Sequence, residues 1–322
     1  MTIRPLGAAL ILTLASACAS TQKSTVGLSR DLAAEGPAAK ASPDTPADSG
    51  ADPLLGVDQP FHGEWTSGGD VLGDVELLDE LARYDLVCVG ERHDDARHHW
   101  AQLAVLYGLS TRAKMAGREL GLGLEMVDFT FQPQLDRYTA GELDLTELTA
   151  EIEWARRWGF DFALYRPLFE LARSRRIPLV GLNARREVTR AVARKGLRGL
   201  DHDSRNELPE WLDFEDPDHR AAFDAAMKDH PPGGEPENLY AAQVVWDETM
   251  AFHAAAWLRG HQPARQLVVA AGLAHCHRSA IPSRVERRMR GVKVISVVPS
   301  VGPPGRDDTL GYDIAMVMGT NH

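Results

Sequence analysis

Six short apolar runs divide the chain after residue 80, and each has the length of a β-strand. Several are nearly continuous in apolar residues, which is typical of strands covered on both faces rather than on one. The runs cover residues 86–89, 121–124, 177–182, 267–271, 292–298 and 313–318.

Helical patterns separate these runs, and the alternation of strand and helix indicates an α/β fold. We expect a largely parallel sheet with helices on both faces. A further helical region, rich in tryptophan, covers residues 143–165. Residues 199–237 are charged, contain prolines and lack a clear period, so we expect a helical insertion there. The helical patterns lie at residues 95–107, 167–176, 185–195, 239–259 and 279–290.

Polar residues follow four of the predicted strands. Glu91 and His93 come after the first strand, and Glu125 comes after the second. Asn183 follows the third strand, and His275 follows the fourth. The carboxyl ends of parallel strands meet at one edge of a sheet, where open α/β sheets bind ligands. We therefore expect these side chains to face one cleft.

Two imidazoles and two carboxylates at this edge allow two kinds of chemistry. Glu91, His93, Glu125 and His275 suit a divalent metal, such as zinc, manganese or iron. The same residues equally suit proton transfer without a metal, with a carboxylate orienting a histidine base. Each histidine belongs to a G-x-x-H element, whose glycine allows a sharp turn and the close approach of a ligand.

The first twenty residues resemble an export signal that ends in a lipid attachment site. Arg4 supplies a positive charge, residues 6–14 are apolar, and small residues precede Cys18. A small-residue run that ends in cysteine resembles a lipobox, in which the cysteine is acylated. Ala15 stands where leucine is usual, and the alternatives are secretion after Ala17 or an uncleaved signal anchor.

We therefore divide the chain into three parts. Residues 1–18 are a lipoprotein signal peptide, residues 19–60 a flexible tether rich in Ala, Ser, Pro and Asp, and residues 61–322 the α/β domain. No later segment approaches the roughly 20 apolar residues that span a bilayer. We expect an exported protein of the cell envelope, anchored by its lipid and facing the periplasm, with the outer membrane as its expected location.

Charge and cysteine content narrow the partners further. The net charge is −11 at pH 7, the pI is near 5.5, and the sequence has no run rich in lysine or arginine. Nucleic acid is therefore not an expected partner, because phosphate binding needs a basic surface. Cys88 and Cys276 could bond if their strands were neighbours, but we expect two buried free thiols.

Five motifs stand out between residues 84 and 300. They are VGERHDDARHHWAQL, GLEM followed by Gln132 and Tyr138, YRPLFELARSRRIPLVGLNARREVTRAVARKG, QVVWDETMAFHAAAWL and VVAAGLAHCH. Together they resemble the ChaN-like haem-binding lipoproteins, in the superfamily that includes the Tiki proteases and erythromycin esterases. The resemblance implies an α/β domain, an envelope location, and haem binding linked to iron uptake.

The resemblance also implies roles for individual residues. In hydrolytic members of the superfamily, the residues that match Glu91, His93, Glu125 and His275 form the catalytic or metal-binding set. The acidic insertion at residues 213–218 has no counterpart that we can assign, and neither does the histidine at position 277.

Haem ligation in the family is ascribed to a tyrosine. Tyr165, in a run that matches the family, is our first candidate, and Tyr138 and Tyr240 are alternatives. A buried core residue whose hydroxyl caps a neighbour is an equally good interpretation of Tyr165.

Residues beside the predicted cleft are expected to support it. His99 and Gln102 stand three apart on the helix at 95–107, so they share one face and could line the cleft, His99 as a haem contact. His98 is expected to point to solvent.

A polar stripe on the helix at 239–259 gives the second group of supporting residues. The stripe includes Gln243 and Asp247, and we expect Asp247 to orient a histidine from outside the cleft. Asn183 is expected to act in the same supporting way. The remaining histidines are interpreted as structural or exposed: His62, His202, His219, His230, His253 and His261.

The sequence thus predicts a haem-binding envelope lipoprotein that serves iron or haem uptake, with a homodimer left open. The alternative is a metal-dependent or His/Glu-dependent hydrolase that uses the GERH and GLAH motifs. The sequence leaves open whether the protein is an enzyme.

Overall fold

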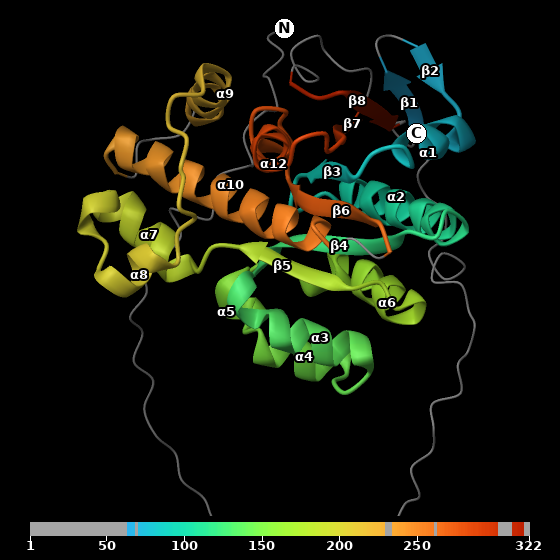
Figure 1. The fold of residues 1–322 in the computed structure, drawn as a ribbon, viewed down its shortest axis with the longest axis horizontal. Helices are drawn as coiled ribbons and strands as arrows, with labels where there is room; N and C mark the ends of the chain where they lie inside the picture. The colour runs from blue at the N-terminus through green and yellow to red at the C-terminus, as the bar shows by residue number, and fades with distance from the viewer. Residues whose placement is uncertain (1–62, 68–69, 229–233, 261–262, 302–310, 319–322) are drawn as a thin grey trace, which may run out of the picture.

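One mixed sheet runs through the middle of the molecule, with strand order β2-β1-β8-β7-β3-β6-β4-β5 (Figure 1). The computed structural model describes residues 63–67, 70–228, 234–260, 263–301 and 311–318. The predicted signal peptide, the tether and Cys18 lie outside the described residues. Within these ranges, no helix is both long enough and apolar enough to cross a membrane.

Neighbouring strands from β8 to β5 run parallel, and each corresponds to one of the predicted apolar runs. The α/β fold and the largely parallel sheet are therefore confirmed. These strands are β3 (Leu86–Glu91), β4 (Glu119–Asp128), β5 (Leu179–Asn183), β6 (Arg265–Gly272), β7 (Val294–Val301) and β8 (Ile314–Met318).

An antiparallel hairpin, which the sequence did not predict, extends the sheet beyond β8. It consists of β1 (Gly63–Ser67) and β2 (Asp70–Leu72), and β1 pairs with β8. Both strands are short and carry polar residues, so they lack the apolar run that identified the others.

Helices lie on both faces of the sheet, as predicted (Figure 1). The α-helices are α1 (Asp74–Leu81), α2 (Ala96–Met115), α3 (Gln132–Ala140), α4 (Leu145–Glu151), α5 (Trp154–Arg157), α6 (Arg166–Arg175), α7 (Arg186–Lys195), α8 (His202–Asn206), α9 (Pro217–Met227), α10 (Pro236–Leu258), α11 (Leu273–Cys276) and α12 (Ile281–Arg288). Short 3₁₀ helices are η1 (Phe129–Phe131), η2 (Phe162–Leu164) and η3 (Leu197–Gly199).

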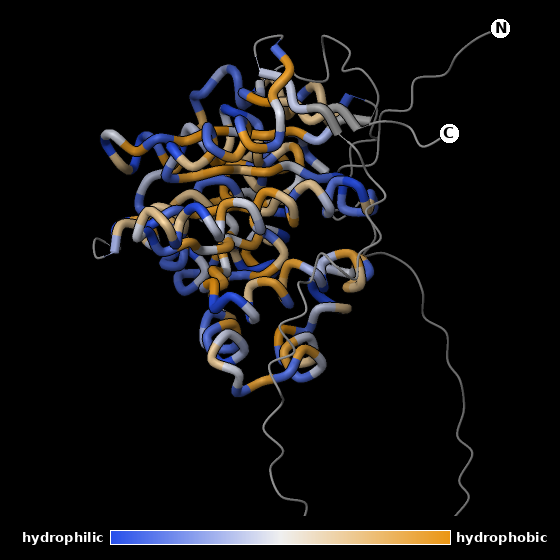
Figure 2. Tube along the Cα trace, turned by 90° about the vertical axis from the view of Figure 1, so that its right-hand side faces the viewer, coloured by the Kyte–Doolittle hydropathy of each residue, from blue (hydrophilic) through white to orange (hydrophobic). Residues whose placement is uncertain are grey.

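Alternate residues of the central strand β3 enter different hydrophobic cores. Val87 and Val89 pack in the core that α2 and α6 cover, whereas Leu86 and Cys88 pack in the core that α10 and α12 cover. A strand buried on both faces must be apolar at successive positions, which explains its unbroken apolar run. Figure 2 shows hydrophobic segments through the middle of the molecule and hydrophilic ones mostly outside.

The predicted helical insertion contains α8 and α9. Phe223 of α9 belongs to a third core with Val192 of α7 and Val244 of α10. Asp216 caps α9 by accepting the backbone N–H groups of the first turn, at 3.1 Å from Asp218 and 3.0 Å from His219. The insertion is therefore packed against α7 and α10.

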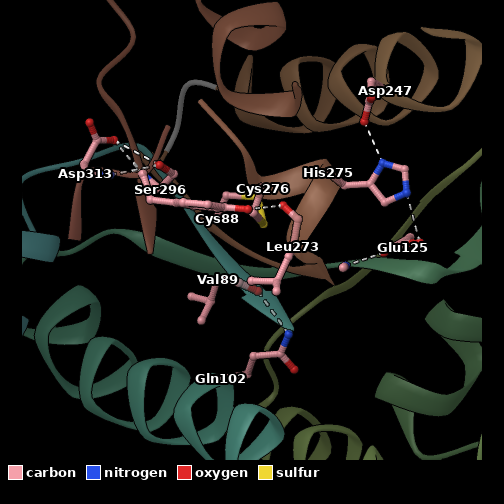
Figure 3. Close-up of a disulfide and its surroundings, with 12 residues drawn as sticks. Cys88, Val89, Gln102, Glu125, Asp247, Leu273, His275, Cys276, Ser296 and Asp313 are labelled. Atoms are coloured by element: carbon pink, nitrogen blue, oxygen red, sulfur yellow. Dashed lines mark hydrogen bonds and ion pairs between the residues drawn. A yellow bond between two sulfur atoms is a disulfide. The ribbon is translucent and has the colours of Figure 1, made fainter. Parts of the chain in front are cut away.

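Cys88 and Cys276 form a disulfide, so the prediction of two free thiols was wrong (Figure 3). Cys276 is not in a strand beside β3. It lies in α11, the single-turn helix after β6, and this helix folds back over β3 with the two Cα atoms 5.3 Å apart. Gly90 allows the approach, because a Cβ atom there would lie 2.9 Å from the Leu273 side chain.

We predict that loss of this disulfide lowers the free energy of unfolding by about 2 to 5 kcal/mol, because the bond closes a long loop in the unfolded chain. The two cysteines are 188 residues apart. Urea unfolding of the oxidised protein, with and without dithiothreitol, measures the effect. The Cys88→Ala/Cys276→Ala variant is the control and should not respond to dithiothreitol. An unchanged midpoint for the reduced wild type would contradict the prediction.

Candidate functional site

A pocket lies at the carboxyl edge of the sheet and reaches His93, Glu125, Asn183 and His275. Its cavity measures about 90 Å³ and is partly open to solvent. Glu91 is not part of the lining; it is fully buried behind His93. The parallel topology thus brings the polar strand ends together, as the sequence predicted, with Glu91 one layer deeper than the others.

Gly272, the last residue of β6, allows two of these side chains to meet. A Cβ atom at this position would lie 3.0 Å from Cε1 of His93 and 3.4 Å from Oε2 of Glu125. The N–H of Gly272 also donates to Oε2 of Glu125, at 2.5 Å. A side chain here would press on the His93 ring, which would have to shift by a few tenths of an ångström, so glycine suits this position.

Glu91 is a buried carboxylate that three side chains hold. Its Oε1 accepts from Nδ1 of His93 at 2.8 Å and from the hydroxyl of Tyr165 at 2.9 Å. Its Oε2 forms an ion pair with Nδ1 of His99 at 2.9 Å. The other ring nitrogen of His99 lies 3.1 Å from the carbonyl oxygen of His93. One carboxylate therefore ties β3 to α2 and to the start of α6.

These contacts set the protonation of Glu91, His93 and His99. Burial alone would raise the pKa of Glu91, but the hydrogen bond from His93 and the contact with His99 outweigh it and hold this pKa well below its usual range. Burial alone would lower the pKa of His93, but Glu91 and then Glu125 raise it. The pKa of His99 is raised, against burial, chiefly by Glu91. Glu91 is therefore ionised at neutral pH, and both imidazoles bind protons more tightly than usual.

His275 lies between two carboxylates on the other side of the pocket (Figure 3). Its Nδ1 is 2.7 Å from Oδ1 of Asp247, and its Nε2 is 3.3 Å from Oε1 of Glu125. Asp247 comes from α10 and is fully buried. Although burial opposes it, Glu125 and Asp247 raise the pKa of His275 well above its ordinary value.

His219, which we interpreted as structural or exposed, belongs to this group. Its Nε2 lies 2.9 Å from Oδ2 of Asp247, and its Nδ1 lies 3.2 Å from the hydroxyl of Tyr240. Gln243 donates to the same Oδ2 at 3.0 Å. The D-P-D-H sequence signals a helix start, but nothing local to it indicates that α9 packs on α10 and brings His219 to Asp247.

The walls of the pocket combine apolar and basic side chains. Trp158 packs against the ring of His93 with ring centres 4.8 Å apart, and Trp246 packs against His275 at 6.1 Å. Phe160 packs against the same His93 ring at 4.8 Å but is not part of the lining. Further lining residues are Met126, Val127, Asp128, Phe131, Ile152, Arg157, Arg186, Thr189 and Arg190. Three of these are the last residues of β4, and three lie on α7.

The candidate tyrosines do not line this pocket. Tyr165 has 0% of its surface exposed and donates its hydroxyl to Glu91. Tyr138 is buried in the core and donates to the carbonyl of Phe169 at 3.2 Å, and Tyr240 pairs with His219. Tyr165 therefore occupies the position of the core residue that we gave as its second interpretation, and not that of a pocket ligand.

The supporting residues stabilise backbone near the site. Gln102 donates to the carbonyl of Val89 at 3.0 Å, and Asn183 donates to the carbonyl of Glu125 at 2.7 Å. The expectation that His98 points to solvent was wrong. Its side chain is buried, and its Nδ1 accepts the N–H of Arg92 at 2.8 Å, because the first turn of α2 folds over this loop.

The predicted metal ligands do not form a ligand set. Among the described residues, no group of three or more His, Cys, Asp or Glu side chains is arranged to hold a metal ion. The four donors are instead paired, Glu91 with His93 and Glu125 with His275. Each carboxylate faces an imidazole rather than a common centre, and metal binding by these four residues stays a prediction.

A protein-family model matches most of the described domain. The family described as "Haem-binding uptake, Tiki superfamily, ChaN" matches residues 77–285, which is more than half of the chain. This range contains Glu91 and Asp247 together with all the histidines that contact these two carboxylates. No curated protein sequence matches the chain.

Solved structures give further matches. ChaN of Campylobacter jejuni, in a structure of cofacial haem binding, aligns with a TM-score of 0.65 at 17% identity, over 80% of this chain and 96% of that one. An erythromycin esterase in its open conformation aligns with a TM-score of 0.44 at 12% identity, over 79% of this chain and 82% of that one. A toxin effector domain from Vibrio vulnificus aligns with a TM-score of 0.39 at 19% identity, over 76% and 39%. The likeness to ChaN shows a shared fold.

We predict that Asp247→Asn lowers the pKa of His275, because the histidine loses a buried charge that favours its protonated form. A raised folded-state pKa stabilises the protein below the ordinary histidine pKa, and this stabilisation is lost as the pH rises through the folded-state value. The wild type should therefore lose more stability between pH 6 and pH 9 than Asp247→Asn. NMR titration of the imidazole and urea unfolding at both pH values measure this.

The exposed Asp203→Asn removes the same charge and serves as the control, since it should leave the His275 titration unchanged. An unaltered His275 titration in Asp247→Asn would show that Asp247 does not set the protonation of this histidine.

Proposed function

Because the chain belongs to the haem-binding uptake family of the Tiki superfamily that includes ChaN, we propose that the pocket at its sheet edge binds haem. We infer further that the protein is an exported lipoprotein and that it handles haem or iron in the cell envelope. The pocket residues support haem binding, and the cysteines support export and lipid attachment.

The observation that carries haem binding is the setting of His93. Its Nδ1 is held by Glu91, while its Nε2 lies on the pocket side, 3.3 Å from the point where a Gly272 side chain would begin. Haem iron is commonly held by an imidazole, and ligating histidines usually donate their other N–H to a carboxylate. The Glu91–His93 pair has this form, and we assign His93 as the nitrogen donor.

The pocket walls fit a flat apolar ligand. Trp158 stands edge-on to His93, and Phe131 and Trp246 also line the pocket. Aromatic side chains offer broad apolar contact to a macrocycle and exclude water around the donor nitrogen. When bound, haem would supply an iron centre that accepts this nitrogen. The chain itself binds and orients the group.

Tyr165 has a different role in this proposal. Its hydroxyl is committed to Glu91, and ligation by Tyr165 would leave a buried carboxylate oxygen without that donor. Burial and the Glu91 charge raise the pKa of Tyr165, which disfavours the phenolate form. We therefore treat Tyr165 as a residue that positions Glu91, and through it His93.

The two histidine–carboxylate pairs also support a second candidate, a hydrolase. His93 and His275 each have a buried carboxylate on Nδ1, and both reach the same pocket with Glu125 between them. Such an arrangement can take a proton from water and return it to a leaving group. This chemistry needs only the side chains of the chain itself.

The cysteines support export. A fully buried disulfide between Cys88 and Cys276 is typical of an oxidising compartment outside the cytoplasm. The signal-like first residues, which end at Cys18, agree with that compartment. Together they favour an envelope protein held to a membrane by acylation.

We predict that Cys18→Ala prevents acylation and releases the protein from the membrane fraction, because the lipid is its expected anchor. Fractionation of cells that express either form, with mass spectrometry of the mature N-terminus, measures this. Unchanged acylation and fractionation of the variant would refute the lipid anchor.

We predict that His93→Ala weakens haemin binding by about 10- to 100-fold and shifts the Soret band, because the iron loses its nitrogen donor. Haemin affinity of the wild type should fall as the pH falls through the raised pKa of His93, since the proton competes for the same nitrogen. Spectroscopic titration of the full chain in its Cys18→Ala form, expected to be free of lipid, measures both effects.

Tyr165→Phe is the comparison variant: it should weaken haemin binding, because Glu91 loses a hydrogen-bond donor, but it should keep the Soret position. A Soret band that responds to Tyr165→Phe and not to His93→Ala would return the ligand role to Tyr165. If the wild type binds no haemin but hydrolyses ester probes, and His93→Ala abolishes this activity, the hydrolase becomes the better assignment.

A further inference from the structure

We propose that Arg186 and Arg190 form a carboxylate-binding site on the α7 wall of the pocket, and that this site receives the two propionates of the ligand. This inference rests on the proposed function, because it names the end of the pocket that holds the charged edge of haem. It adds a ligand-binding site that does not involve His93 or His275.

The position of the two arginines is the first argument. Both line the pocket, both are half-buried, and they stand four residues apart on α7. Residues four apart share one face of a helix, so the two guanidinium groups point along the same wall. Thr189, between them in sequence, also lines the pocket.

The lack of acidic partners is the second argument. Within the described residues, neither Arg186 nor Arg190 forms an ion pair, although the chain carries a net charge of −11. Arg186 donates to the carbonyl of Arg156, and burial together with the neighbouring charge of Arg190 lowers the pKa of Arg186. The charge of Glu187 acts on Arg186 in the opposite sense, but it is not within ion-pair distance. Two half-buried cations with no carboxylate in contact among the described residues favour an anion between them.

Other charges around the pocket are already compensated. Arg157 pairs with Glu153 at 2.9 Å, with Asp128 at 3.3 Å and with Glu187 at 3.4 Å. Glu125 is held by His275 and by the N–H of Gly272. Of the three arginines that line the pocket, Arg186 and Arg190 are therefore the two that have no ion pair among the described residues.

The chemistry of the arginine side chain identifies the ligand group. A guanidinium offers parallel N–H donors that match a carboxylate in a two-point hydrogen bond. Haem carries two carboxylates on one edge of an otherwise apolar macrocycle. Arginines on α7 and aromatic side chains near the strand ends together suit a ligand with one charged edge and one apolar body.

The test compares haemin with haemin dimethyl ester, which keeps the iron and the macrocycle but lacks the two charges. We expect Arg186→Gln/Arg190→Gln to weaken haemin binding by about 10- to 100-fold, since hydrogen bonds to charged groups have that strength. Binding of the ester should be the same in the variant and the wild type. Spectroscopic titration uses the full chain in its Cys18→Ala form.

The matched control is Arg194→Gln/Arg198→Gln, which removes the same charge from exposed positions outside the pocket lining. This control should bind haemin as the wild type does. A second variant, Arg186→Lys/Arg190→Lys, keeps the charge but not the two-point geometry, and should lie between wild type and the glutamine variant. It also serves if the glutamine variant folds poorly.

The outcomes separate this inference from the proposed function. Equal losses for haemin and its ester, or no loss, would overturn the arginine site while haem binding stands. If the wild type binds neither haemin nor its ester, the haem proposal is wrong. The anion site is then tested by measuring whether citrate raises the melting temperature of the protein. Stabilisation of the wild type by citrate, absent in the glutamine variant, would support the site; no stabilisation would overturn it.

Discussion

The last residue of the central strand β3 is Glu91, a buried carboxylate, and the other side chains of the site are arranged around it. A buried carboxylate is costly unless hydrogen bonds and opposite charges replace its water. Glu91 meets this requirement with His93, His99 and Tyr165, which come from three different segments. Because the carboxylate cannot lose these partners cheaply, α2 and the start of α6 are fixed relative to β3, and His93 is held with one nitrogen toward the pocket.

The opposite side of the pocket follows the same rule with different elements. Asp247 is fully buried in α10 and contacts His275 from α11 and His219 from the insertion. The disulfide at Cys276 ties the helix that carries His275 to β3. A covalent bond and a buried charge thus fix one histidine from two directions. The insertion is part of the site because it supplies His219, and not only a cover for the sheet.

Patterns along the chain predicted what depends on local sequence and on the rules of parallel sheets. The apolar runs predicted the six parallel strands, and the polar residues after four of these runs predicted which side chains would gather at one edge. Long-range packing escaped this reasoning. Cys276 lies on a helix that folds back over β3, and His219 depends on how α9 packs against α10. Tyr165 lies in a motif that identifies the family, but a motif does not say whether a side chain faces the pocket or the core.

The two candidate functions make opposite demands on one atom. Nε2 of His93 can hold iron or carry a proton, but it cannot do both at once. Glu91 increases the electron density and the basicity of this imidazole in either case, so the contacts of the carboxylate alone do not choose between them. The choice rests on what fills the rest of the pocket. Aromatic side chains in the lining and two arginines on α7 without an ion pair match a flat ligand with a charged edge better than they match a single water molecule, and this favours haem.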